Sequence, residues 1–196
     1  MNKNTKEIES YRSLRTRIQL GHPEDKLISV ISNDQGDGKT EIVYKLAESF
    51  AKAGKKVLMI DGNLRYPDLS LKLRQEGHKG LDSLLRSKGD LVNSLIQCDH
   101  DKLFILPTQE SSHDSTELLQ SKFIFNIIEE VRKQFDYILI DTLSLNEGMD
   151  GLILSKISDG AIYLTVGNKT KSKMVEEYRT MLEEANIKLL GAIWKH

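Results

Sequence analysis

The chain has 196 residues, which is enough for one domain with a substantial hydrophobic core. Its 28 Lys and Arg residues nearly balance 29 Asp and Glu residues, so its charge gives no reason to expect binding to nucleic acid. One cysteine, Cys98, excludes an internal disulfide and fits a reducing cytoplasm. No apolar run approaches the roughly 18 residues of a membrane span, and the polar start is unlike a secretory signal. We therefore expect a single soluble domain over 1–196 that reaches a membrane only through a partner.

Buried strands and amphipathic helices are expected to alternate along the chain. Segment 1–20 is expected to be a helix. Nearly continuous apolar runs, typical of parallel strands covered on both faces, predict strands over 27–32, 56–60, 102–107, 136–141, 161–166 and 188–194. Apolar residues at helical spacing predict helices that end at Gly54, that cover 118–134 after a capping box at 114–117, and that cover 171–186. The alternation predicts an α/β fold, doubly wound, with a mostly parallel sheet and helices on both faces.

The stretch SNDQGDGKTE, between the first strand and its helix, predicts a nucleotide site. It contains a Gly-rich loop and the residues that such a loop needs, namely Gly36, Asp37, Gly38, Lys39 and Thr40. Glycines let backbone N–H groups wrap phosphates, the lysine reaches the β- and γ-phosphates, and the threonine hydroxyl ligates Mg²⁺. An ordinary Gly-rich turn is the alternative, but the position between a strand and a helix favours a P-loop that binds ATP.

Two acidic residues are expected beside this loop, because ligands of doubly wound sheets bind at the carboxyl ends of the strands. Asp61 follows the strand 56–60, and Asp141 ends the strand 136–141 as a Walker B aspartate does. Either residue alone could be a helix or turn cap. Together, beside a phosphate loop, they predict a Mg²⁺ site, since Mg²⁺ takes a few carboxylates and phosphate oxygens as ligands.

Several ordered segments resemble the cytoplasmic domain of bacterial tyrosine kinases, the regulators of capsule and exopolysaccharide synthesis. ESYRSLRTRI matches the family's E-x-x-R-x-x-R opening with Glu9, Arg12 and Arg15. GDGKT matches its Walker A motif, KKVLMIDGNLRYP its Walker A′ strand, ELLQS its E-L-L-x-S segment and FDYILIDT its Walker B motif. Asp150 lies nine residues after Asp141, where the family also has an Asp, and SDGAIYL matches the family's next strand. The resemblance covers nearly the whole chain.

The resemblance implies an ATP-dependent protein-tyrosine (auto)kinase. Lys39 would hold the transferred phosphate, while Thr40, Asp61 and Asp141 would organise Mg²⁺. Asp61 would also accept the proton of the substrate tyrosine. Arg65 would either neutralise charge near the phosphates or form a surface ion pair, and the residues leave both readings open.

The resemblance also implies partners. Glu9, Arg12 and Arg15 recur every three residues on the helix within 1–20, so they share one side of it. They would form either pairs within the helix or a subunit contact that closes a homo-oligomer, such as a ring. The Gram-positive form of the family is a soluble kinase that is paired with the cytoplasmic tail of a membrane activator. Proteins that contain tyrosine would be its substrates.

The sequence also departs from the family pattern around the expected site. Asn33 begins the loop, Asn63 replaces an acid, Leu143 and Ser144 replace two prolines, Lys195 replaces an adenine-facing Asn, and Glu41 replaces a small hydroxyl residue. A Glu41 side chain that points inward would oppose the nucleotide, whereas one that points outward would only favour the helix dipole. The chain also lacks the C-terminal tyrosine cluster. Besides an active kinase, the residues thus allow a weak or inactive regulatory module, or a MinD/ParA-like ATPase; Asp34, where MinD/ParA proteins carry a signature lysine, favours the kinase.

Overall fold

The protein is built on one seven-stranded sheet, seen in a computed structural model that describes residues 3–74, 79–87, 89–167 and 172–195. The spatial order is β3-β4-β2-β5-β1-β6-β7. Every neighbouring pair is parallel except β3 and β4, which are antiparallel. The strands are β1 (Leu27–Ser32), β2 (Val57–Asp61), β3 (Ile96–Gln97), β4 (Leu103–Leu106), β5 (Tyr137–Asp141), β6 (Gly160–Val166) and β7 (Leu189–Lys195).

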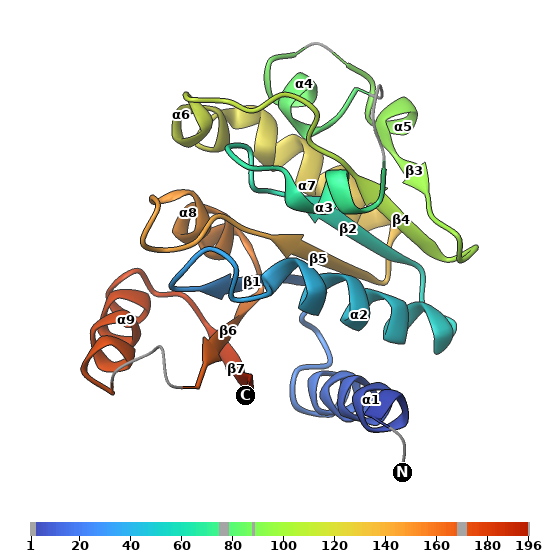
Figure 1. Cartoon of the computed structure of the whole chain (residues 1–196). Coiled ribbons are helices and arrows are strands. Elements are labelled where there is room, and N and C mark those ends of the chain that lie inside the picture. The colour runs from blue at the N-terminus through green and yellow to red at the C-terminus, as the bar shows by residue number, and fades with distance from the viewer. Residues whose placement is uncertain (1–2, 75–78, 88, 168–171, 196) are drawn as a thin grey trace.

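Helices cover both faces of this sheet (Figure 1). They are α1 (Lys3–Gly21), α2 (Lys39–Lys52), α3 (Asp68–Lys72), α4 (Leu81–Leu85), α5 (Leu91–Ser94), α6 (Ser115–Leu119), α7 (Lys122–Gln134), α8 (Asp150–Ile157) and α9 (Ser172–Glu184). Side chains of α1 and α2 share one apolar cluster with the sheet, and those of α4, α6, α7 and α8 share another. The doubly wound, mostly parallel α/β fold expected from the sequence is confirmed.

Strand β1, apolar except at Ser29 and Ser32, shows why the strands read as nearly continuous apolar runs. All six of its residues are buried. Ile28 and Val30 point into the cluster with α2, whereas Leu27 points into the cluster with α7. A strand covered on both faces needs apolar side chains at successive positions, not at alternate ones. All six predicted strands are present within two residues of their expected ends.

Two details of the predicted elements differ. The helix expected over 118–134 is broken at Gln120–Ser121 into α6 and α7. The expected capping box is wrong, because the Asp114 carboxylate makes no capping bond and instead accepts hydrogen bonds from Arg86 and Ser112. Strand β3 was not predicted, since two residues are too few to show a pattern.

The predicted end of the helix before Gly54 is confirmed. Gly54 follows the last turn of α2 with a positive φ of 85°, as expected of a glycine that ends a helix. Helix α9 begins at Ser172, and residue 171, where the prediction began, lies outside the described residues. Within the described part of the chain, no helix is long and apolar enough to cross a membrane.

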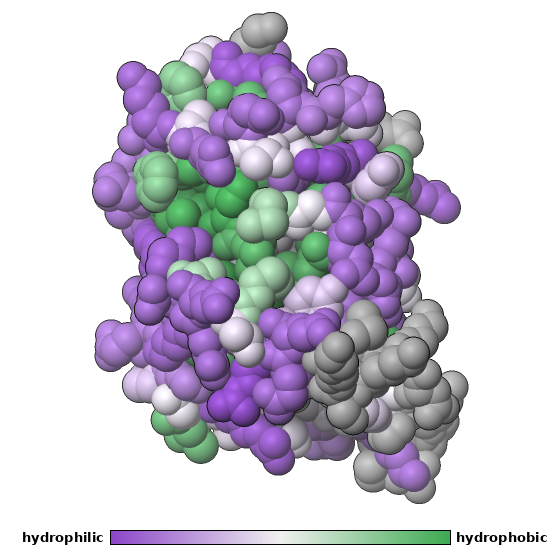
Figure 2. All heavy atoms as spheres, turned by 90° about the vertical axis from the view of Figure 1, so that its left-hand side faces the viewer, coloured by the Kyte–Doolittle hydropathy of each residue, from purple (hydrophilic) through white to green (hydrophobic). Residues whose placement is uncertain are grey.

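The surface on the side of α6, α8 and α9 is mostly polar, with apolar side chains gathered in its middle (Figure 2). The partly buried residues packed against the cluster beneath α6, α7 and α8 include Leu118, Phe123, Ile153 and Ile157. Helix α1 and the edge strand β7, which lie near the two described ends of the chain, are neighbours, since Ile18 and Leu190 line one pocket between them (Figure 1).

Candidate nucleotide-binding site

The strand order brings the predicted site residues to one edge of the sheet. β5 lies between β1 and β2, and Asp61 and Asp141 are partners in the parallel register of β2 and β5. β1 ends at Ser32 at this same edge and leads into the Gly-rich loop and α2. The loop and both acids therefore meet at the carboxyl ends of three adjacent strands.

The loop is shaped by its glycines and one aspartate. Gly36 and Gly38 have positive φ angles of 80° and 106°, which side chains with a Cβ rarely adopt. Asp37 is buried, and its carboxylate accepts a hydrogen bond of 3.0 Å from the backbone N–H of Asp34. Gly38 is the N-cap of α2 and offers no side-chain cap, so the first N–H groups of the helix can bind an anion.

Lys39 is held at this edge by two serines. Its side-chain Nζ donates to Ser32 Oγ at 3.0 Å and to Ser144 Oγ at 2.8 Å, and the residue is only 7 % exposed. Burial lowers the pKa of Lys39, opposed by the charges of Asp141 and Asp37. An ammonium group has three N–H donors, so one remains that can meet a phosphate oxygen.

Both acids are buried, and each keeps one carboxylate oxygen without a hydrogen-bond partner. Oδ2 of Asp61 accepts from the backbone N–H of Ser70 at 2.8 Å and from its hydroxyl at 2.6 Å. Asp141 accepts a hydrogen bond from the Thr40 hydroxyl. Burial, followed by repulsion from Asp141, raises the pKa of Asp61 to about 8, and burial raises that of Asp141 to about 6.

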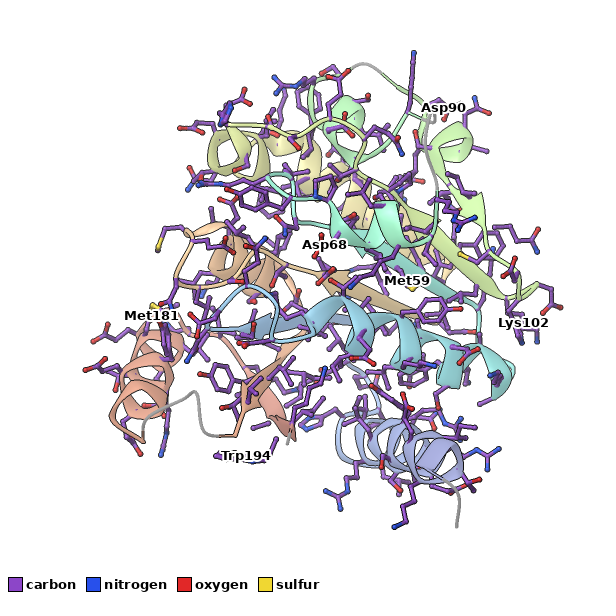
Figure 3. The ribbon with its side chains drawn as sticks, in the orientation of Figure 1. Met59, Asp68, Asp90, Lys102, Met181 and Trp194 are labelled. Carbon is purple, nitrogen blue, oxygen red and sulfur yellow. The ribbon has the colours of Figure 1, made fainter. Side chains whose placement is uncertain are left out.

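These residues fit a magnesium ion. The partnerless oxygens of Asp61 and Asp141 are buried acceptors that a cation would satisfy, and the Thr40 hydroxyl lies beside Asp141. In the part of the chain that the structure describes, no three His, Cys, Asp or Glu side chains form a metal cage. Mg²⁺ binds through one or two carboxylates together with phosphate oxygens, and two carboxylates beside a phosphate loop are what these residues supply. Asp68, drawn between α3 and α2 in Figure 3, carries a negative charge that adds to the rise in the pKa of Asp141. The same charge opposes the lowering of the pKa of Lys39 by burial.

Arg65 contacts neighbouring helices. Its Nε donates to Ser115 Oγ at 2.9 Å and lies 3.4 Å from Oδ2 of the buried Asp150. Another of its nitrogens lies 3.3 Å from Thr116 Oγ1. Arg65 therefore ties the loop after β2 to the starts of α6 and α8. Its ion pair with Asp150 corresponds to the second of the two roles that the sequence left open for Arg65.

The residues that depart from the family pattern have defined partners. Glu41 lies in the first turn of α2, and its Oε2 accepts a hydrogen bond of 2.7 Å from Lys195 Nζ. Oδ1 of Asn33 accepts a hydrogen bond of 2.6 Å from the Tyr163 hydroxyl. Asn63 Oδ1 accepts from the backbone N–H of Tyr66.

The pair of Glu41 and Lys195 lies on the wall of a cleft over the loop. The cleft has a volume of about 600 Å³. Its wall is formed by Gly36, Gly38, Thr40, Glu41, Tyr44, Leu69, Lys72, Leu73 and Lys195. The Glu41 side chain therefore faces a cation, and the acid does not stand alone beside the loop.

Sequence reasoning missed the polar residues that hold the site residues. Ser32 and Ser144 bind Lys39, Ser70 binds Asp61, and Thr108 Oγ1 donates to the backbone carbonyl of Asp61 at 2.7 Å. Ser144 could have been singled out, because it comes soon after the Walker B strand. Nothing in the spacing of Ser70 or Thr108 indicates that they reach Asp61.

The three residues predicted for oligomerisation lie on α1, away from this cleft. Arg12 forms an exposed ion pair of 2.6 Å with Glu9. Arg15 donates from Nη1 to the backbone carbonyl of Ser49 at 2.6 Å, so it joins α1 to α2 within the chain. A groove of about 590 Å³ between these helices is lined by residues that include Ile8, Arg12 and Arg15.

The structure has a mostly parallel sheet between two layers of helices, a Gly-rich loop between β1 and α2, and acids at the ends of β2 and β5. Together these features define a P-loop nucleotide-binding protein. Residues 25–155 match the AAA domain family. Two curated relatives are named tyrosine-protein kinases. CpsD of Streptococcus pneumoniae is 35% identical over 187 residues, which cover 95% of this chain and 82% of the relative. YwqD of Bacillus subtilis (strain 168) is 30% identical and is covered over 79% of its length. The chain belongs to the bacterial tyrosine kinase family, as its motifs predicted.

Solved structures share the fold of this chain. The chimerical protein CapA2B2 has a TM-score of 0.89 at 26% identity, covering 95% of this chain and 83% of its own. The kinase domain of Escherichia coli tyrosine kinase ETK has a TM-score of 0.90 at 21% identity, covering 96% and 74%. MinD of Pyrococcus horikoshii, solved with Mg-ADP, has a TM-score of 0.72 at 23% identity, covering 86% and 69%, and shares the fold.

Proposed function

We propose that this chain is an ATP-dependent protein-tyrosine kinase that regulates the synthesis of capsular or extracellular polysaccharide. The observation that carries the proposal is the arrangement at the carboxyl edge of the sheet. The buried Lys39 stands beside two buried acids, and each acid has an oxygen without a partner. Phosphoryl transfer needs mainly positioning and charge neutralisation, which such a set of groups can supply.

Each residue then has a role in this reaction. Lys39 binds the phosphate that is transferred, while the N–H groups of Gly36, Asp37 and Gly38 and the start of α2 bind the rest of the polyphosphate. Thr40, Asp61 and Asp141 would hold Mg²⁺, which supplies positive charge to the phosphates when it is bound.

Asp61 is also the residue that accepts the proton of the tyrosine hydroxyl. Ser70 orients it through the two hydrogen bonds to Oδ2, which leave Oδ1 facing the site that the magnesium ion and the tyrosine hydroxyl would share.

Partners follow from the family. We infer that the kinase acts in the cytoplasm, is recruited to the inner face of the membrane, and is activated by the cytoplasmic tail of a membrane protein. We also infer a homo-oligomer in which Glu9, Arg12 and Arg15 take part, and the groove between α1 and α2 supports a contact with a second copy. Proteins that contain tyrosine are the substrates.

One set of observations favours a second candidate, a nucleotide-binding regulatory module with weak or no kinase activity. Asn63 supplies no charge where the family has an acid, and Glu41 and Lys195 replace neutral residues at the cleft. Arg65, which the sequence offered as a phosphate contact, is already paired with Asp150.

Incubation with Mg-ATP distinguishes these functions. Phosphotyrosine and free phosphate are measured separately, for the chain alone and after fusion to the cytoplasmic tail of its membrane partner. A kinase gives phosphotyrosine that rises with the tail and disappears in Lys39→Met, which removes the cation at the phosphate. A regulatory module binds ATP and gives neither product, and a MinD/ParA-like ATPase gives only free phosphate. Failure of the wild-type chain to bind ATP or ADP would overturn all three.

A further inference from the structure

Lys195 reaches the phosphate loop from the opposite end of the chain. It is the last residue of β7, where it is the register partner of Val166, and its carbonyl accepts a hydrogen bond of 2.8 Å from the N–H of Gly167. Its backbone is thus fixed at the same sheet edge at which the loop lies. Trp194, labelled in Figure 3, precedes it and is 55% exposed.

The Lys195 ammonium lies directly against the loop. A Cβ at Gly38 would be only 2.5 Å from Lys195 Nζ, so the ammonium occupies the space that a side chain would fill. Nζ also donates a hydrogen bond of 2.7 Å to Glu41 Oε2. Because Glu41 is in the first turn of α2, this bond holds the cation over the N-terminus of the helix.

The strand order gives Lys195 a place along the nucleotide. From β2 to β7 the sheet edge carries Asp61, Asp141, the loop after β1, then β6, and finally Lys195. Lys39 points toward Ser144, which follows β5, and therefore toward the magnesium side. A nucleotide with its terminal phosphate at that side extends along the cleft toward β7. Lys195 then faces the phosphate that is nearest the nucleoside.

We propose that Lys195 binds the phosphate nearest the nucleoside of ATP or ADP, and that it also neutralises the charge of Glu41 beside the loop. The inference rests on the proposed function, since it requires a nucleotide in the cleft. Glu41 alone would repel a polyphosphate, and Lys195 cancels that charge while it adds a donor over the loop. Glu41 and Lys195, which both depart from the family pattern, thus act together as one ion pair. Lys72, on α3, contributes a second cation to the same cleft.

Calorimetry with Mg-ADP tests this inference. Lys195→Ala and Lys195→Gln are expected to weaken binding at least about tenfold, because both remove the positive charge and leave the charge of Glu41 uncompensated. Glu41→Thr combined with Lys195→Ala is expected to bind more tightly than Lys195→Ala alone, because the unpaired carboxylate is gone. Glu41→Thr alone is expected to bind at least as tightly as the wild-type protein.

Lys188→Ala is the matched control, since Lys188 precedes the other end of β7 and forms an ion pair of 2.6 Å with Asp25. It is expected to leave the affinity within about threefold of wild type. Affinity within threefold of wild type in both Lys195 variants would overturn the inference, and so would tighter binding, which would mean that the ion pair closes the cleft. In both outcomes the wild-type protein still binds ADP and the proposed function stands. No binding by the wild-type protein would overturn the proposed function itself.

Discussion

The Nζ of Lys39 lies 2.8 Å from Oγ of Ser144, at a position where the family pattern has proline. Proline has no side-chain donor or acceptor, so this bond belongs to the present chain and not to the family pattern. With Ser32 on its other side, the ammonium is held between two serine hydroxyls at the start of α2. The serine that replaces proline therefore helps to hold the ammonium group of Lys39 in place.

Ser144→Ala tests this support. Both partners are buried and one is charged, so we expect a loss of about 1–3 kcal/mol in the free energy of unfolding of the nucleotide-free protein. Urea denaturation measures it. Ser121→Ala is the matched control, because the Ser121 hydroxyl is buried without a hydrogen-bond partner. Equal losses in the two variants would show that the bond to Lys39 does not stabilise the fold.

The pH dependence of stability is expected to follow the buried acids. The pKa of an aspartate in an unfolded chain is about 3.9, whereas that of Asp61 is raised to about 8 and that of Asp141 to about 6 in the fold. Between these values the folded, metal-free protein retains protons that the unfolded chain has released. Its free energy of unfolding should therefore fall as pH rises from about 4 to about 8, by up to about 1.4 kcal/mol per pH unit for each proton.

Urea denaturation without magnesium or nucleotide, at several pH values, measures this fall. Asp61→Asn stays neutral at every pH, so its fall should be smaller. Asp114→Asn should retain the full fall, because Arg86 lowers the pKa of the exposed Asp114 and its effect is confined to acid pH. A midpoint that stays constant or rises between pH 5 and 8 would contradict the prediction.

The sequence singled out most of the residues that meet at this edge of the sheet, because their signals are local. The loop from Gly36 to Thr40 carries its chemistry in five consecutive residues, and Asp61 and Asp141 end apolar runs that only buried strands explain. The partners of these residues come from distant segments. Ser144 is 105 positions from Lys39, and no spacing indicates that contact.

Other features could not be predicted because tertiary contacts outweigh local propensity. Asp114 matches a capping box, yet its carboxylate forms an ion pair of 2.7 Å with Arg86, which is 28 residues earlier. The helix therefore begins without its expected cap, and a second helix begins after Ser121. In the same way, the sequence did not indicate whether the Glu41 side chain points inward or outward, because its partner Lys195 comes from the distant strand β7.

Tyr66 is the tyrosine that we expect to be phosphorylated if the chain modifies itself. Its side chain is 50% exposed, and it follows Arg65 in the loop after β2, near the magnesium edge. Tyr137 and Tyr163 are buried. After incubation with Mg-ATP and the activator tail, mass spectrometry should find phosphate on Tyr66, and Tyr66→Phe should lose most of the phosphotyrosine signal. Tyr178→Phe, at a half-buried site on α9 outside the cleft, is the control and should keep it. A signal unchanged in Tyr66→Phe would contradict the prediction.

The subunit contact predicted on α1 needs a variant that leaves the chain's own contacts intact. Substituting Glu9, Arg12 and Arg15 together would also remove the bond from Arg15 to Ser49, which holds α1 on α2. The double substitution Glu9→Ala with Arg12→Ala removes only an exposed pair, which contributes little to the stability of the monomer. We therefore expect the double variant to keep its melting temperature within a few degrees and to become monomeric.

Light scattering with Mg-ATP present measures the mass, beside Arg179→Ala with Glu183→Ala as the control. That control removes an exposed ion pair of 2.9 Å on α9, far along the chain from α1, and should leave the oligomer unchanged. An oligomer of unchanged mass in the Glu9 and Arg12 variant would show that these two residues pair only with each other. Loss of the oligomer in both variants would mean that surface charge in general, and not the contact on α1, controls assembly. Loss in the α1 variant alone would place the subunit interface on the helix that lines the groove with Ile8 and Arg15.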